Sequence, residues 1–188
     1  MHLHRLVQAI LLSRQAGSAA GDGIAAVAVR LLRATVPAGP WNDPVTWPAW
    51  RQLLPHVLTV TSRDPKSADE DVAWLLDRAA TYLQTQGSPR LARPLSEQAF
   101  ELYQGLRGKD HPNTLGSANL AHALRALGEH QQARQLHEDT LTRCRRVLDE
   151  DHPHTLVSAS NLAGVLHALG EHEQARQLEE YVRTHRKG

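Results

Sequence analysis

Apolar residues recur along most of the chain at the three- and four-residue spacing of amphipathic helices, and no segment alternates as a strand would. The spacing is clearest in the second half, where one apolar set is followed by a matching set: Leu120, Ala121, Leu124 and Leu127, then Leu162, Ala163, Leu166 and Leu169. Such a face cannot be buried by one helix alone, so neighbouring helices must pack together. The pattern predicts an all-α fold.

A repeat accompanies this pattern. The sequence LGEHQQARQL at 127–136 returns as LGEHEQARQL at 169–178, and a weaker copy lies upstream. Each copy has a glycine, followed five positions later by an alanine: Gly87 and Ala92, Gly128 and Ala133, Gly170 and Ala175. Glycine ends a helix where a left-handed residue is needed, and alanine allows close helix approach. We predict three helical hairpins over 72–107, 110–148 and 151–186.

Residues 1–60 are predicted to form a helical head that precedes the repeats. The glycines within 17–23 are expected to interrupt it, so that a helix begins after Asp22, whose side chain is placed to cap it. The polar and least periodic stretch, 61–71, is interpreted as the linker between the head and residues 72–188.

Four tryptophans gather near the junction of head and repeats: Trp41, Trp47, Trp50 and Trp74. Two interpretations remain open for them, namely packing in a core and stacking against a ligand.

The last copy, DHPxTLxSxxNLAxxLxxLGxxxxAR over 151–176, resembles the long tetratricopeptide repeat (TPR) of kinesin light chains. Similar repeats are found at the C-terminal side of bacterial NB-ARC/STAND ATPases, and 3–11 and 50–57 resemble the segment that joins such an ATPase to its repeats. The resemblance implies a right-handed superhelix of helical hairpins and a signalling or regulatory role.

The resemblance also implies a binding face on the first helix of each hairpin, where an asparagine ladder grips an extended peptide. Carried over by position, the ladder residues are Asn119 and Asn161, with Arg78 in the first copy. Further turns of the same helices add Thr81, Gln84, His122, Arg125, Gly164 and His167. The alternative is ordinary exposed helix polarity. Arg78 and Arg125 favour an acidic or carboxylate-ended ligand.

The middle copy departs from the repeat by one residue. From Asp110 to Gly128 it is one position shorter than from Asp151 to Gly170. One residue is about 100° of helix rotation. We therefore expect its first helix to start late or irregularly, which puts Leu115 and Ser117 in doubt as counterparts of Leu156 and Ser158.

Catalytic chemistry is not indicated. The chain has no GxxxxGK[ST] loop for nucleotide phosphates, and its single cysteine, Cys144, excludes a multi-cysteine zinc site. Twelve histidines invite a metal interpretation, but their i, i+2 pairs rarely converge on one ion within a helix. The net charge of +1 and the lack of a long apolar run favour neither nucleic acid nor a membrane. We expect no enzyme activity and no cofactor.

The sequence therefore predicts a protein- or peptide-binding scaffold or sensor module, with the cytoplasm as the expected location. The alternative is self-assembly through the Trp-rich head or through an unpaired face of the last hairpin formed by Ala175, Leu178 and Val182.

Overall fold

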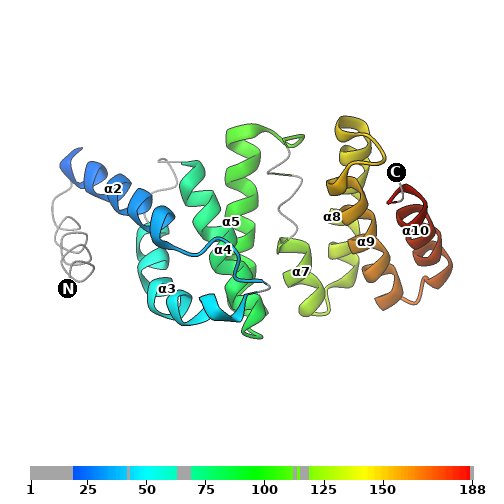
Figure 1. Cartoon of the computed structure of the whole chain (residues 1–188), viewed down its shortest axis with the longest axis horizontal. Helices are drawn as coiled ribbons and strands as arrows, with labels where there is room; N and C mark the ends of the chain where they lie inside the picture. Colours follow the sequence, from blue (N-terminus) through cyan, green and yellow to red (C-terminus); the bar gives the residue numbers. More distant parts are fainter. Residues whose placement is uncertain (1–18, 42, 63–68, 112–113, 115–118, 187–188) are drawn as a thin grey trace.

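The computed structural model describes residues 19–41, 43–62, 69–111, 114 and 119–186. Helices form the described part of the chain, which contains no strand, so the predicted all-α class is confirmed (Figure 1). The head consists of α2 (Ala19–Thr35), a 3₁₀ turn (Pro44–Thr46) and α3 (Trp47–Thr61). The prediction for the start of the middle copy falls on 115–118, outside the described residues.

In the rest of the described chain, six helices form three antiparallel pairs, which run in a row from the head to the C-terminus (Figure 1). The first helices of the pairs, here called the inner helices, are α4 (Glu70–Thr85), α7 (Asn119–Ala126) and α9 (Pro153–Ala168). The second helices, here called the outer helices, are α5 (Pro89–Arg107), α8 (His130–Leu148) and α10 (His172–His185).

The turn inside each pair has the same geometry in all three copies. Gly87, Gly128 and Gly170 have φ values of 68°, 80° and 78°, the left-handed region that the repeat pattern predicted. The next residue closes each turn with a backbone hydrogen bond of 2.9 Å to the carbonyl five positions earlier, as Glu129 does to Leu124. The recurring glycine therefore sets where the chain reverses.

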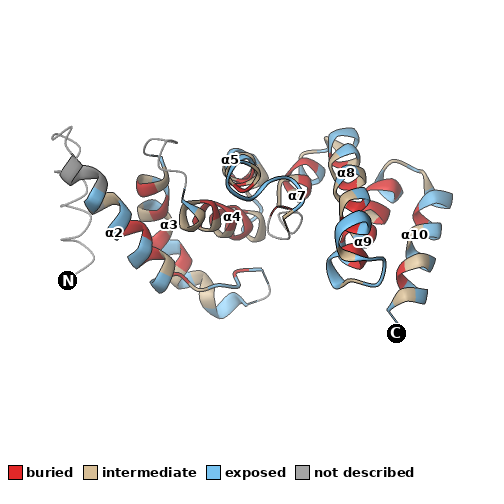
Figure 2. Cartoon of the chain, turned by 90° about the horizontal axis from the view of Figure 1, so that it is seen from above, coloured by how far each residue is buried: buried red, intermediate tan, exposed pale blue. Residues whose placement is uncertain are grey.

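The recurring alanines lie at the contact between the two helices of a pair. Ala92, Ala133 and Ala175 are all fully buried, and Figure 2 shows buried and exposed stretches alternating along α10. In the last pair, Ala175 packs in one cluster with Leu162 and Leu166 of α9. A larger side chain would force the helices apart, because protein interiors are close-packed.

Charged residues join one pair to the next through a device that also repeats. Arg93 contacts Glu97 on its own helix at 2.8 Å and Glu129 of the following copy at 2.5 Å. Arg134 makes the equivalent contacts with Glu138 at 2.7 Å and Glu171 at 2.5 Å. These cross-copy ion pairs fix the register in which neighbouring pairs stack.

The head differs from prediction at its first helix. α2 already includes residue 19 and passes through Gly21 and Gly23, so the expected interruption is wrong for residues 19–23, as is a helix start capped by Asp22, while residues 17–18 lie outside the described residues. Tertiary contacts outweigh the helix cost of glycine here, since Val29, Leu32 and Val36 lie in the core shared with α3 and α4. The head is thus packed onto the first copy.

Local signals also set the start of α9. Proline occupies its first turn, and the Nδ1 atom of His152 accepts a hydrogen bond from the backbone N–H of His154 at 3.1 Å. His152 therefore acts as the helix cap.

None of the described helices is long and apolar enough to cross a membrane.

Candidate ligand-binding face

The residues predicted to bind a ligand come from all three inner helices, but the structure gives them different surroundings. Asn119 on α7 is directed at α4. Its Nδ2 atom donates to the Asp77 carboxylate at 2.6 Å and to Thr81 Oγ1 at 2.9 Å. Gln84 on α4 donates back to the Asn119 carbonyl at 2.9 Å, and Thr81 is buried. These polar groups join α4 to α7.

Arg78, the first-copy counterpart of the ladder asparagines, is engaged by the head. Its Nη1 atom donates to the Ala38 carbonyl at 3.3 Å, and Nη2 lies 3.0 Å from the carboxylate of Asp77. The loop between α2 and α3 thus lies on α4 at the position predicted to start the asparagine ladder. Arg78 holds a main-chain carbonyl of its own chain.

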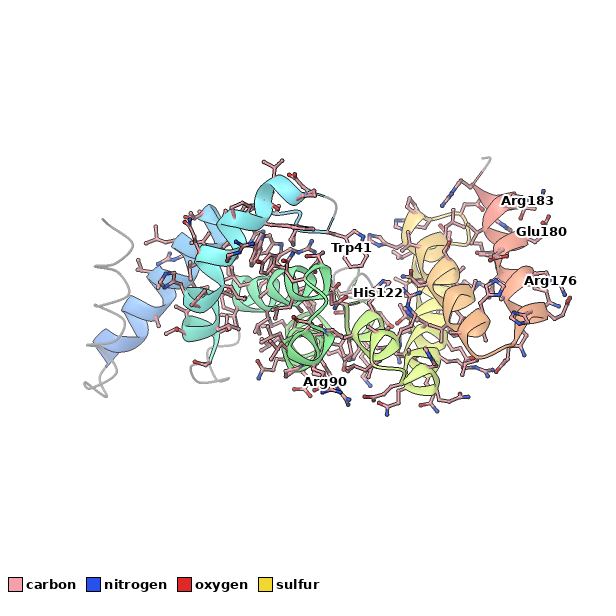
Figure 3. The ribbon with its side chains drawn as sticks, turned by 90° about the horizontal axis from the view of Figure 1, so that it is seen from below. Trp41, Arg90, His122, Arg176, Glu180 and Arg183 are labelled. Carbon is pink, nitrogen blue, oxygen red and sulfur yellow. The ribbon has the colours of Figure 1, made fainter. Side chains whose placement is uncertain are left out.

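His122 on α7 lies between two other rings. Its ring centroid is 5.7 Å from that of Trp41, which belongs to the head loop, and 6.2 Å from that of His137 on α8. Trp41 and His122 are both labelled in Figure 3, where they lie close to each other. Burial and the nearby Arg125 lower the pKa of His122, so this ring is uncharged at neutral pH.

His137, the third ring of this group, is only 3% exposed. Burial, with contributions from His122 and Arg125, lowers the pKa of His137 to about 4. The sequence pattern gave no signal for the burial of this residue, because a histidine on an outer helix is usually exposed to solvent.

Arg125 and Asn161 are the two predicted binding residues whose side chains are not held by polar or ring contacts with described residues. Arg125 is exposed on α7 and forms no ion pair with any described residue. Its Nη1 atom lies 3.5 Å from the position that a Cβ atom at Gly164 would take, so the guanidinium rests on α9. The partly buried Asn161 lies one turn earlier on α9 and has no side-chain hydrogen bond to a described residue.

Replacing Gly164 with alanine is expected to stabilise the fold by up to about 1 kcal/mol, because alanine favours a helix interior over glycine. The added methyl group would touch Arg125 at 3.5 Å, an ordinary contact distance. Thermal or urea unfolding followed by circular dichroism measures the change. A destabilised Gly164→Ala variant would show that the guanidinium needs closer access to the α9 backbone.

His167 is engaged at the end of the array. Its Nε2 atom lies 2.9 Å from the Glu179 carboxylate of α10, and its Nδ1 atom lies 3.2 Å from Nδ1 of His172. The structure thus brings His167 to α10 and not to α7.

Metal binding by the histidines and nucleophilic chemistry at Cys144 were the other candidates from the sequence. No group of three histidine, cysteine, aspartate or glutamate side chains among them is placed to hold a metal ion. Cys144 is buried, and burial raises the pKa of its thiol, which lies 3.6 Å from Ser158 Oγ. A buried thiol with a raised pKa is a poor nucleophile.

The core-packing interpretation of the tryptophans is confirmed for three of them, and stacking against a ligand stays a prediction. Trp50 is fully buried in the head core, and Trp47 and Trp74 are packed against that core. The guanidinium of Arg33 covers the Trp74 ring, 3.5 Å from its centroid. Trp41 alone among the four is 49% exposed.

The predicted self-assembly face on the last hairpin is wrong in the residues it names. Ala175 and Val182 are buried, and Leu178 packs on the same cluster against α9. The open side of α10 carries charged residues instead, and Figure 3 shows Arg176, Glu180 and Arg183 there.

Comparisons with known proteins agree with the repeat architecture. Two tetratricopeptide repeat models match in succession, over residues 72–113 and 114–184, which together make up more than half of the chain. No curated protein matches the chain.

Solved structures share the fold at low identity. A putative kinesin light chain from Podosopora anserina, with nearly identical TPR-like repeats, has a TM-score of 0.63 and 22% identity, covering 96% of this chain and 94% of its own. BtubC (BKLC) from P. vanneervenii has a TM-score of 0.67 and 15% identity, covering 97% and 70%. The predicted NB-ARC/STAND context stays a prediction. The three glycine-reversed helix pairs and the two successive model matches show that the chain belongs to the tetratricopeptide repeat family.

Proposed function

We propose that this protein is a binding module that holds an acidic protein segment against the exposed side of α7 and α9. The observation that carries the proposal is the charge of these two helices. Neither contains an aspartate or a glutamate, whereas Arg125 presents an exposed guanidinium between them. A guanidinium in this position fits a carboxylate in two-point geometry.

The arginines of the outer helices provide a contrast. Arg93, Arg134 and Arg143 each contact two carboxylates of the protein, at distances from 2.5 to 3.2 Å. Their charges are neutralised within the fold, and Arg93 and Arg134 also join neighbouring copies. Arg125 has no such role among the described residues, which favours a partner outside the chain.

Asn161 supplies the second contact of the proposed site. Its counterpart Asn119 is held by the side chain of Asp77, but the residue that corresponds to Asp77 in the middle copy is Ala118, which has no side-chain acceptor. The Asn161 amide can therefore donate to and accept from the backbone of a bound peptide. Arg125 would select for acidic residues and Asn161 for an extended main chain.

Fluorescence anisotropy with a library of labelled acidic dodecapeptides tests the proposal, with the Asn/Gln version of each peptide as reference. We expect members of the acidic set to bind more tightly than about 100 µM, and Arg125→Gln to weaken them at least about tenfold. Arg176→Gln is the matched control, because it removes an exposed arginine from the far side of α10. Equal binding of both peptide sets, or binding that survives Arg125→Gln, would overturn the proposal.

Binding of this kind suits a sensor or scaffold in a signalling assembly. The resemblance of the head and repeats to the C-terminal part of NB-ARC/STAND ATPases supports that wider role, and an ATPase of this class encoded directly upstream would be its simplest genetic sign.

A further inference from the structure

The head loop at 37–41 lies on the inner helices and is anchored at three points. Trp50 Nε1 donates to the Pro37 carbonyl at 3.2 Å, and Trp47 Nε1 donates to the Pro40 carbonyl at 3.0 Å. Arg78 of α4 donates to the Ala38 carbonyl at 3.3 Å. Pro40 itself is fully buried. The loop is thus bound to α3 and α4 immediately before Trp41.

Anchoring the loop determines where the Trp41 ring lies. The ring is in contact range of His122 on α7, with a centroid distance of 5.7 Å and an interplanar angle of 41°. About half of its surface remains exposed, although a tryptophan can bury a large apolar area. Arg125 follows His122 by three residues on the same helix, so it lies one turn further along. An exposed aromatic ring therefore lies at one end of the cationic surface on α7.

We infer that Trp41 forms the end wall of the acidic-peptide site, so that the head and not only the repeats determines what the protein binds. The inference rests on the proposed function. A peptide whose carboxylate pairs with Arg125 lies against α7 and α9 and packs its neighbouring atoms on the exposed part of the Trp41 ring. It cannot extend over α4 along the same line, because the loop already lies there and holds Arg78.

The charges around the Trp41 ring favour an acidic peptide segment as the molecule that packs on it. The described ring neighbour of Trp41 is the neutral His122, the nearest cation along α7 is Arg125, and α7 and α9 bring no carboxylate. A second copy of the chain would have to place acidic residues here, which the test below examines separately.

The test compares Trp41→Ala and Trp41→Phe by anisotropy, with the acidic dodecapeptides that bind the wild-type protein as probes. Trp41→Ala is expected to weaken binding about five- to thirtyfold, and Trp41→Phe, which keeps an aromatic face, less than about threefold. Val45→Ala is the matched control, because Val45 is 87% exposed in the adjoining 3₁₀ turn. Unfolding curves check that the variants keep the wild-type fold.

The outcomes separate this inference from the proposed function. If Arg125→Gln abolishes binding while Trp41→Ala and Val45→Ala bind as the wild type does, the function stands and the wall is overturned. If no acidic peptide binds, the proposed function is overturned, and the inference that rests on it is overturned with it. Sedimentation equilibrium of the wild-type protein would also overturn the inference if it showed a dimer that Trp41→Ala dissociates, because a second copy would then occupy the wall.

Discussion

Replacing Trp50 with alanine is expected to lower the free energy of unfolding by about 3–5 kcal/mol, the usual range for truncating a buried aromatic residue. Trp50 is fully buried in α3 and stacks on Tyr82 of α4, with ring centroids 5.8 Å apart and planes 16° apart. The substitution would leave a cavity and also remove the hydrogen bond to the Pro37 carbonyl. Urea unfolding followed by circular dichroism at 222 nm measures the loss.

Two further variants define the cause of that loss. Trp50→Phe keeps an aromatic ring but loses the indole N–H, so it should cost clearly less than Trp50→Ala. Trp41→Ala truncates a half-exposed tryptophan of the same head and should change stability by less than about 1.5 kcal/mol. Equal losses for Trp50→Ala and Trp41→Ala would show that the head core does not hold α2 and α3 on the repeats.

The contrast between these two tryptophans shows how far the sequence could determine the site. Spacing alone could not separate Trp41 from Trp50, because the difference depends on tertiary contacts with Pro37, Tyr82 and His122 that the spacing of residues does not show. Local turn chemistry, by contrast, was readable. Gly128 takes a left-handed conformation for reasons contained within a few residues, and the prediction there was confirmed.

The two ladder asparagines make the same point within the repeat itself. Asn119 and Asn161 occupy equivalent positions, yet among the described residues only Asn119 contacts a buried carboxylate, that of Asp77. The repeat pattern records shared positions and not the residue that faces each one across a helix contact. The proposed binding site therefore depends on contacts between helices, which engage Asn119 but leave Asn161 without a side-chain hydrogen bond to a described residue.

One missed feature did leave a signal in the sequence. The glutamate directly after the repeat glycine, Glu129 or Glu171, recurs in step with the arginines Arg93 and Arg134 of the preceding copy. Opposite charges that recur at a fixed offset between copies predict a cross-copy pair. The same reasoning could not have found the contact between Trp41 and His122, because the head has no counterpart in the repeats.

Acidification from pH 7 toward pH 4 is expected to destabilise the protein through His137. Its pKa is about 4 in the folded chain and 6.5 in the unfolded chain, so between these values the unfolded state binds more protons. The stability due to neutral His137 is therefore complete above pH 6.5 and is lost as the pH falls toward 4. The full difference corresponds to about 3 kcal/mol, and the lowered pKa of His122 acts in the same direction.

Urea unfolding at several pH values between 4 and 7.5 measures this effect as the difference between wild type and His137→Phe. Carboxylates titrate in both proteins, so only the excess pH dependence of the wild type belongs to His137. His154→Gln is the matched control, because it removes an exposed histidine of α9 that forms no ion pair with a described residue. Parallel curves for wild type and His137→Phe would show that His137 is not held neutral by the fold. Diverging curves, which are the expected result, would show that the fold holds His137 neutral. His137 would then be a ring whose protonation is unfavourable, in contact with His122, the ring that Trp41 also contacts.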